Sequence, residues 1–485
     1  MAAIVGLGPT AVALDAGRTS PWPQFQGGPG HAGVAADAPA PPYKVAWTFK
    51  VAPENGQSLS APIIADGEAI SVGPAAVYGV DLVTGQQDWN VPRTGTPSAP
   101  AVAELGGRSI LLYTDDTGAD STLDAIDLGT RKPLWDPFPL KATGTTGVTV
   151  DGTKAFVGDA DGAIYAVDVA TGKQLWPSKV LAAPVRGPIT VADGKLLAVP
   201  QSQDPQNRLE AELVALDEST GEEAWGKPFA PNVPTPVGSL VASANGTAVA
   251  SFPTGFSDGT VYGLSTADGG ERWSARSVSS PFTFQAPAVS EDAVYVAGLS
   301  GGLERIDPST GDRVWLFHFN RRSIRSSPVI VGDQVVLGFD DGSISAVSAQ
   351  TGHLVWQTST GTGLVGAIAA SPDVLVAAKG GTGGGLVALE NDPNGSTIDV
   401  SSPTVPRYGA ILANFAVGFV IVGGIIFLVF TLAARRIGPP ENDRSGSAPT
   451  EEDDGEYDAD DDEGEDADEE AGDGREDVDE QGSDP

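Results

Sequence analysis

The chain has 485 residues, no cysteine, and 64 acidic against 28 basic side chains, which gives a net charge of −36. The absence of cysteine excludes disulfide bonds, thiol nucleophiles, covalent haem attachment and a lipid-modified cysteine, and the scattered basic residues argue against nucleic acid as a partner. The length is ample for a large core, and 62 glycines and 38 prolines indicate a turn-rich β protein.

The acidity extends over the whole chain. Residues 441–485 contain 23 acidic and 2 basic side chains, and the remaining residues still have 41 against 26. An acidic, lysine-poor folded domain keeps a hydrated, self-repelling surface, which halophilic proteins use to stay soluble. We therefore expect a haloarchaeal origin, with an ordinary acidic protein as the alternative.

Residues 1–20 form an apolar segment of mostly small side chains, with Ala11, Val12 and Ala13 as a cleavage triplet. The segment is similar to the apolar region of a signal peptide, but the positively charged start is absent. We expect a truncated signal peptide; the alternative is that the segment is not a signal. Residues 21–43, including the stretch 39–42 (PAPP), are predicted to be a lead-in linker.

From residue 44 to residue 400 the chain repeats one unit. In residues 164–176, Asp168 and Thr171 are expected to cap backbone N–H groups of a turn between two strands, and Gly172 to take the positive φ that closes it. In seven units a tryptophan follows the turn residue by eight positions. These turn residues are Asp81, Asp127, Asp168, Asp217, Ser265, Asp307 and Ser348, and the tryptophans are Trp89, Trp135, Trp176, Trp225, Trp273, Trp315 and Trp356.

An eighth unit, residues 386–395, keeps the turn but has Ile398 at the tryptophan position, and Trp47 near the start of the chain supplies the missing aromatic. Each unit also has an earlier apolar run and a second hairpin. Four short strands per ~40–45 residues is the size of a propeller blade. We therefore predict an all-β, eight-bladed β-propeller of four-stranded blades, in which residues 44–51 form the outer strand of the last blade and remove the free sheet edge.

Two motifs carry a family resemblance. Residues 166–176 follow the pattern A-x-D-x-x-T-G-x-x-x-W, and residues 22–34 have the sequence WPQFQGGPGHAGV. Both resemble the pyrroloquinoline-quinone (PQQ) enzyme repeat superfamily, and the resemblance implies that each tryptophan packs between neighbouring blades. The superfamily contains quinoprotein dehydrogenases and also non-enzymatic propellers, such as the barrel-assembly lipoprotein of bacterial outer membranes. Fold does not choose between these functions.

Residues 408–434 are predicted to form a transmembrane helix, because residues 409–434 carry no charge and ~20 apolar residues are enough to span a bilayer. A buried core helix is the alternative, but no helical domain is predicted that would bury it. Arg435 and Arg436 follow the segment, against Arg407 before it, so a single-pass topology with the propeller outside the cell is expected. The acidic residues 437–485 contain too few apolar side chains to fold and are predicted to be a disordered cytoplasmic tail.

Few residues suggest chemistry. His31, His318 and His353 lack the spacing of metal ligands. Residues 159–162 and 340–342 resemble the start of a calcium loop but lack its later glutamate, so hairpin turns are the favoured interpretation. Two asparagines, Asn245 and Asn394, fit the glycosylation pattern, which often arises by chance.

The residues just before each inner strand are predicted to line the mouth of the central funnel. An arginine there would bind a carboxylate, a phosphate or a quinone acid through paired hydrogen bonds; the alternative is an arginine paired with an aspartate of a neighbouring blade. The predicted binding residues are Arg186, Phe284, Gln285, Arg325 and Ser326.

Two functions remain. The first is a membrane-anchored, extracytoplasmic propeller that binds proteins or another ligand, with no catalytic residue, metal or cofactor. The second is a PQQ-dependent quinoprotein dehydrogenase acting on alcohols or sugars. For such enzymes the resemblance implies PQQ with Ca²⁺, a vicinal cysteine pair, an aspartate base, and Glu and Asn calcium ligands. The chain has no cysteine and no recognisable context for the others, so we favour the scaffold.

Overall fold

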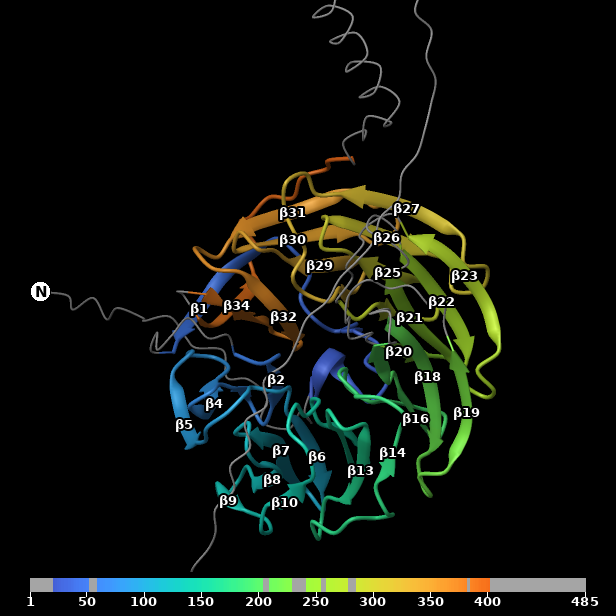
Figure 1. Cartoon of the computed structure of the whole chain (residues 1–485). Coiled ribbons are helices and arrows are strands. Elements are labelled where there is room, and N and C mark those ends of the chain that lie inside the picture. The colour runs from blue at the N-terminus through green and yellow to red at the C-terminus, as the bar shows by residue number, and fades with distance from the viewer. Residues whose placement is uncertain are drawn as a thin grey trace, which may run out of the picture. The chain divides into compact units, whose positions relative to one another are not determined.

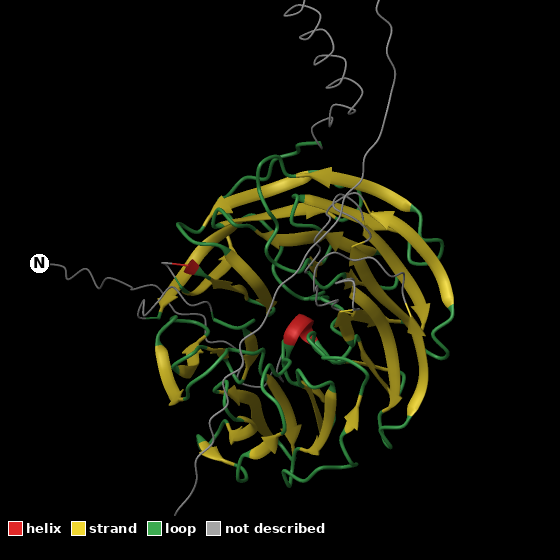
Figure 2. Ribbon diagram, in the orientation of Figure 1, coloured by secondary structure: helices red, strands yellow, loops and turns green. Residues whose placement is uncertain are grey.

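The computed structural model of the protein describes residues 21–51, 59–203, 209–228, 241–253, 259–277, 285–381 and 384–401. These residues form one short 3-10 helix, η1 (Phe25–Gly27), and strands β1 to β34. The strands build eight antiparallel sheets arranged as blades of a ring (Figures 1 and 2). The predicted eight-bladed, all-β propeller is confirmed, whereas residues 1–20, 408–434 and 437–485 lie outside the described residues. Within the described residues, no helix is long and apolar enough to cross a membrane.

Blades 1 to 4 follow the chain, and blades 2 and 4 each have an extra short strand. Their strands are β2 (Ile63–Ala65), β3 (Glu68–Val72), β4 (Ala76–Asp81) and β5 (Gln87–Pro92); β6 (Ala101–Leu105), β7 (Arg108–Asp116), β8 (Ser121–Asp127), β9 (Lys132–Pro133) and β10 (Phe138–Leu140); β11 (Thr149–Asp151), β12 (Lys154–Gly158), β13 (Ala163–Asp168) and β14 (Lys179–Val180); and β15 (Thr190–Ala192), β16 (Lys195–Ala198), β17 (Gln201–Gln203), β18 (Leu209–Asp217) and β19 (Glu223–Pro228).

Blades 5 to 7 each contain four strands in chain order from the axis outward. They are β20 (Val241–Ala244), β21 (Thr247–Pro253), β22 (Gly259–Ser265) and β23 (Glu271–Ser277); β24 (Ala288–Val289), β25 (Val294–Ala297), β26 (Gly302–Ile306) and β27 (Arg313–His318); and β28 (Val329–Val331), β29 (Gln334–Gly338), β30 (Ser343–Ser348) and β31 (Leu354–Ser359).

Blade 8 joins the two ends of the propeller. It consists of β32 (Val365–Ala370), β33 (Val374–Lys379), β34 (Gly385–Asn391) and, as the outer strand, β1 (Tyr43–Lys50). β1 pairs antiparallel with β34, with Tyr43 opposite Asn391 and Lys50 opposite Gly385. The ring therefore closes through the N-terminal strand, as predicted, and blade 8 has no vacant outer position.

The end of the described chain leaves blade 8 and lies against blade 7. The backbone N–H of Ile398 donates to the carbonyl of Val355 over 2.8 Å, and Val400 forms an isolated bridge with Leu354. Ile398 therefore does not occupy a tryptophan position of blade 8, although its spacing in the sequence suggests one. The physical reason is that β1 already fills the outer position of that blade.

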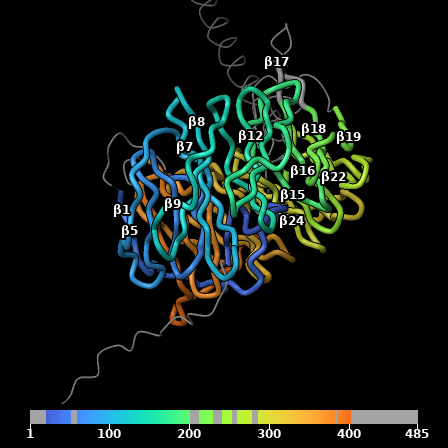
Figure 3. The backbone as a smooth tube through the Cα atoms, turned by 90° about the horizontal axis from the view of Figure 1, so that it is seen from below, coloured from blue at the N-terminus to red at the C-terminus, as the bar shows by residue number. Residues whose placement is uncertain are grey.

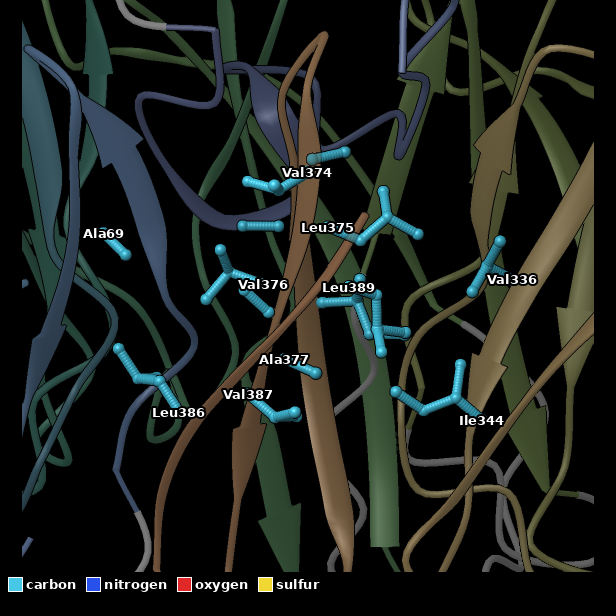
Figure 4. Close-up of a cluster of buried hydrophobic side chains, with 14 of the residues drawn as sticks. Ala69, Val336, Ile344, Val374, Leu375, Val376, Ala377, Leu386, Val387 and Leu389 are labelled. Atoms are coloured by element: carbon cyan, nitrogen blue, oxygen red, sulfur yellow. The ribbon is translucent and has the colours of Figure 1, made fainter. Parts of the chain in front are cut away.

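The hydrophobic core lies between the faces of neighbouring blades. The second strand of a blade is covered on both faces by its neighbours, and for this reason β33 (VLVAAK), the second strand of blade 8, is buried at every position. Figure 4 shows the cluster shared by blades 7, 8 and 1, in which Val336 and Ile344 of blade 7 and Ala69 of blade 1 flank Val376 and Leu389 of blade 8. Each blade is thus stabilised by the apolar faces of both neighbours.

The repeat tryptophans dock onto the next blade. Six of them donate an indole Nε1–H hydrogen bond to a backbone carbonyl in the third-to-fourth-strand turn of the following blade. These pairs are Trp47 with Leu82, Trp135 with Val169, Trp176 with Glu218, Trp225 with Thr266, Trp273 with Pro308 and Trp315 with Ala349. Buried indoles need such a partner for their N–H group, and the bond fixes how neighbouring blades lie against each other.

The turn aspartates shape the surface onto which the tryptophans pack. The Asp217 carboxylate accepts hydrogen bonds from the Thr220 backbone N–H over 2.9 Å and from the Thr220 hydroxyl over 3.1 Å. Hydrogen bonds from the Thr220 side chain and backbone hold the pKa of Asp217 below its usual range. Asp81, Asp127, Asp168 and Asp307 accept the corresponding backbone bonds in their own turns.

Blade 1 docks differently because the turn of blade 2 has Gly-Thr-Arg where the other turns have Thr-Gly or its equivalent. Arg131 takes the position of the turn glycine, with φ of 57°, and its guanidinium lies 4.6 Å from the centroid of the Trp89 ring. Trp89 donates Nε1–H to Glu68 over 2.8 Å, and Glu68 also forms an ion pair with Arg131. Trp356 also departs from the pattern, since it packs edge-on against Tyr43 of β1 with ring centroids 5.0 Å apart.

The lead-in forms the hub of the ring. Residues 22–35 form backbone or side-chain hydrogen bonds to the inner strands of seven blades, and η1 lies near the centre in Figure 2. Taken from blade 1 to blade 7, the pairs are Trp22 with Ile64, Pro23 with Val102, Gln24 with Val150, Pro29 with Val191, Gly30 with Ser243, Ala32 with Val289, and Gly33 and Ala35 with Ile330. The sequence suggests a linker here, but the structure buries this part of it.

His31 belongs to this hub and is 1% exposed. Its Nδ1 lies 2.8 Å from the carbonyl oxygen of Phe25, and its Nε2 lies 3.1 Å from that of Ile189 in blade 4. Burial lowers the pKa of His31 below its usual 6.5, so the ring stays neutral at neutral pH. The contacts of this histidine are those of a structural residue.

Candidate binding face

The propeller has two faces that differ in their connections. We call upper the face at which the outer strand of one blade ends and the inner strand of the next begins, and lower the face that contains the turns between third and fourth strands. In Figure 3, β17 lies on the upper side and the residues that follow β34, in orange, lie on the opposite side. The predicted funnel residues all precede inner strands, so the described ones belong to the upper face.

Arg186 and Arg325 occupy equivalent positions in blades 4 and 7. Each follows an isolated bridge that opens the blade, formed by Val185 in one case and Ile324 in the other. Both arginines are exposed, and neither guanidinium forms an ion pair or hydrogen bond with a described residue. No aspartate of a neighbouring blade pairs with either side chain in the described ring, so their full charge faces solvent.

The other predicted funnel residues differ from these arginines. Ser326 is completely buried, and its hydroxyl accepts a 2.8 Å hydrogen bond from the backbone N–H of Gly338. Ser60 and Thr146 accept the same kind of bond in blades 1 and 3, so this hydroxyl holds the first two strands of a blade together. Gln285 is half-buried at the equivalent position of blade 6, and Phe284 lies outside the described residues.

Four further cations lie at the upper face of blades 7 and 8, and the position of the inner strands does not indicate them. Arg321 and Arg322 belong to the connection between β27 and β28, and Lys50 and Lys379 lie at the ends of β1 and β33. The signal that could have identified the first two is the density of arginine in residues 320–325 (NRRSIR). The two lysines are more than 300 residues apart in the chain, and the closure of blade 8 brings them together.

The acidic turns of the upper face bind their own backbone. Asp159 is fully buried and accepts hydrogen bonds from the N–H groups of Asp161 and Ala163 and from the Tyr165 hydroxyl. Asp341 accepts the N–H of Ser343 over 3.0 Å. These contacts support the interpretation of both segments as turns. Across the described ranges, no group of three or more His, Asp or Glu side chains could hold a metal ion.

The lower face is acidic and contains the two glycosylation motifs. Asn245 and Asn394 are both exposed in turns. His353 also lies there, with Nδ1 2.6 Å from the Asp399 carboxylate. A hollow of about 760 Å³ is lined by lead-in residues 34–38 and by residues 370–373 of blade 8; its charged lining residues are Asp37 and Asp373. The charged lining of this hollow is therefore acidic, whereas two arginines that pair with no described residue, Arg186 and Arg325, lie on the upper face.

Sequence relatives agree with this architecture. A family model described as outer membrane protein assembly factor BamB matches residues 119–225 and 209–404. The BamB protein of Yersinia pestis is 27% identical over 150 residues, which cover 30% of this chain and 38% of that protein. The chain thus spans well under half of the length of this relative.

Solved structures extend the likeness in fold to most of the ring. BamB from Moraxella catarrhalis superposes with a TM-score of 0.56 and 16% identity, covering 72% of this chain and all of that one. The quinohemoprotein alcohol dehydrogenase of Comamonas testosteroni gives a TM-score of 0.59 and 14% identity, covering 81% and 83%. At these identities the likeness concerns the fold, whereas the family model covers more than half of the chain. The chain therefore belongs to the BamB family of PQQ-like β-propellers.

Proposed function

We propose that this chain is a membrane-anchored, extracytoplasmic β-propeller that holds partner proteins on its upper face. The observation that carries the proposal is the pair of exposed, unpaired arginines, Arg186 and Arg325, at equivalent positions of a rigid closed ring. Such a ring presents side chains in connections without straining the blades. Membership of a family named for an assembly factor supports protein partners.

The dehydrogenase alternative has less support. Its solved neighbours share the fold at 14% identity, and fold is compatible with both functions. A quinone held with calcium requires a set of oxygen ligands, and the described residues contain no group of three or more His, Asp or Glu side chains that could hold a metal ion. We therefore assign no catalytic step to any side chain of this protein.

The arginine pair provides a direct test of the proposal. Changing Arg186→Ala and Arg325→Ala together should alter the free energy of unfolding by less than about 0.5 kcal/mol, because neither side chain has a partner to lose. The same change should weaken recovery of proteins captured by a photo-crosslinking residue placed beside the funnel mouth. A matched control is Lys132→Ala with Lys173→Ala, which removes two exposed charges of the lower face.

Three results would contradict this view. The first is a double variant that unfolds, which would give the arginines a structural role. The second is PQQ-dependent dye reduction by the purified chain with alcohols or sugars. The third is equal recovery of crosslinked partners from the wild type and both double variants, which would mean that the arginines do not contact the partner.

The topology is tested separately. Because Arg435 and Arg436 follow the apolar segment and Arg407 alone precedes it, the propeller should lie outside and the acidic tail inside. Protease added to intact cells should remove the propeller and leave an epitope on the tail, and lysed cells should lose both. Protection of the propeller with loss of the tail epitope would reverse the topology.

A further inference from the structure

We propose that one sector of the upper face, over blades 7 and 8, binds an acidic segment of a partner protein. This basic sector consists of Arg321, Arg322, Arg325, Lys50 and Lys379. The inference rests on the proposed scaffold function and deepens it, because it assigns the contact to one part of the ring and states the chemistry of the partner.

The connection between β27 and β28 presents the arginines in a fixed loop. Asp340, in the turn between β29 and β30, accepts the N–H of Ser323 over 3.0 Å, and its own N–H donates to the Ser323 carbonyl over 3.0 Å. On either side of this anchor, Arg321 and Arg325 are exposed and their guanidinium groups contact no described acid. The loop therefore holds two free guanidinium groups on one anchored segment.

Arg322 lies between them and is held by neutral groups. Its guanidinium carbon lies 4.9 Å from the centroid of Phe339 and 5.5 Å from that of Phe319. Its nitrogens donate to Ser343 Oγ over 3.2 Å and to Gln357 Oε1 over 3.0 Å. Aromatic faces and neutral oxygens orient a cation without cancelling its charge, so the positive potential of Arg322 remains.

The two lysines add charge from blade 8. Lys50 of β1 and Lys379 of β33 both lie opposite Gly385 of β34, so no side chain of that strand separates them. Lys379 is 5% exposed, and its Nζ donates to the carbonyl of Thr360 over 2.5 Å. Burial, and then the nearby charge of Lys50, lower the pKa of Lys379. A carboxylate brought to this site would offset the charge of Lys50 and favour the charged form of Lys379.

Several cations elsewhere in the described ring are paired with an acid, whereas no ion pair between described residues lies within the basic sector. Lys44 pairs with Glu390, Arg108 with Asp127, Arg131 with Glu68, Lys154 with Glu218 and Arg313 with Glu304. In the basic sector the neighbouring acids are Asp340 and Asp341, and both accept hydrogen bonds from backbone N–H groups. Among the described residues, five cations against these two acids leave the sector positive in a chain whose net charge is −36.

The negative charge of the rest of the ring limits the length of an acidic ligand that can bind to the basic sector. A long polyanion would be repelled by the acidic remainder of the ring, whereas a short acidic segment gains the attraction of the sector and avoids the rest. Charge complementarity of this kind mainly accelerates association and selects the partner. A protein segment is the occupant consistent with a family named for an assembly factor.

The test uses the full chain and a short fluorescent peptide of alternating glutamate and serine, with a glutamine–serine peptide as the uncharged counterpart. Anisotropy should show binding of the glutamate peptide that weakens as salt rises toward about 0.15 M. Arg321→Gln with Arg325→Gln should raise its Kd about tenfold. The matched control Lys132→Gln with Lys173→Gln changes the net charge equally and should alter the Kd less than about twofold.

Several outcomes would overturn the proposal. One is equal binding of both peptides, and another is an equal effect of both double variants on the Kd. A third is displacement of the peptide by inorganic phosphate at unchanged ionic strength, which would indicate a site for small anions. If the arginine variant unfolds, Lys50→Gln tests the same sector from another blade and should weaken binding about threefold. If partners are captured by crosslinking near Arg325 but the peptide does not bind, only the proposal of an acidic partner segment is rejected. If partners are not captured either, the proposed scaffold function is rejected as well.

Discussion

A chain that begins at residue 52 will unfold at a sharply lower temperature than the full chain. This truncation removes β1, and with it the pairing that runs from Tyr43 opposite Asn391 to Lys50 opposite Gly385. It also removes the lead-in, whose hydrogen bonds to inner strands contribute about 1 kcal/mol each, and the buried Trp22, which contributes about 3–5 kcal/mol. The total is comparable with the whole free energy of unfolding of a typical domain, about 5–15 kcal/mol.

A second truncation separates the two contributions. A chain that begins at residue 36 keeps β1 and loses the hub, so differential scanning calorimetry of the two truncated chains measures closure and hub independently. We expect both to melt well below the full chain, and the shorter chain to melt lowest. An unchanged melting temperature for the chain beginning at residue 52 would contradict ring closure. An unchanged melt for the chain beginning at residue 36 would contradict the structural role of the lead-in.

The second large effect is expected at a docking tryptophan. Trp176→Ala should lower the free energy of unfolding by roughly 3–5 kcal/mol, as for other buried aromatic side chains cut to alanine. Trp176 is 6% exposed, donates to the Glu218 carbonyl over 3.1 Å, and lies against Gly221 of the next blade. The substitution leaves a cavity between blades 3 and 4 and removes the bond that orients them. Denaturant unfolding of the purified chain measures the change.

Two companion variants make this measurement specific. Leu175→Ala changes the preceding residue, which is 44% exposed, and should cost less than about 0.5 kcal/mol. Gly221→Ala approaches the same contact from the other blade, because a Cβ there would lie 2.6 Å from Trp176 and the backbone φ is +70°. We expect it to destabilise the ring clearly. A loss below about 1 kcal/mol for Trp176→Ala would mean that the tryptophan does not hold the blades together.

The fold could be predicted because each blade repeats the same local chemistry. The eight-residue spacing from Asp168 to Trp176 identifies a strand, a capped turn and a packed aromatic, and seven such copies define the ring. Trp47 also indicated closure, because it supplies the aromatic that the eighth unit lacks. The different docking of blade 1 could not be predicted from the spacing of the repeats. Arg131 stacks on Trp89 because this non-glycine residue adopts a positive φ in its turn.

The hub and the binding face were harder to predict, because both depend on contacts between distant parts of the chain. Residues 22–35 lack a strand pattern, and their bonds go to seven blades, so the sequence suggested a linker. Ser326 was selected by position, but its hydroxyl bonds to Gly338 inside the blade. Lys50 and Lys379 become neighbours only across Gly385. The spacing of the repeats identifies which residues lie at equivalent positions of the blades. Contacts between distant parts of the chain decide which of those side chains stay unpaired.

The pairing of β1 with β34 imposes an order on biosynthesis. The ribosome makes Lys50 early and its partner Gly385 late. At about 5–20 residues per second, β34 is synthesised roughly 20 to 70 seconds after β1. During that interval β1 is an unpaired edge of the kind that aggregates. The lysines at positions 44 and 50 place a charge near each end of this strand, which is how edge strands resist self-association. We therefore infer that the nascent chain is at its most vulnerable just before the ring closes.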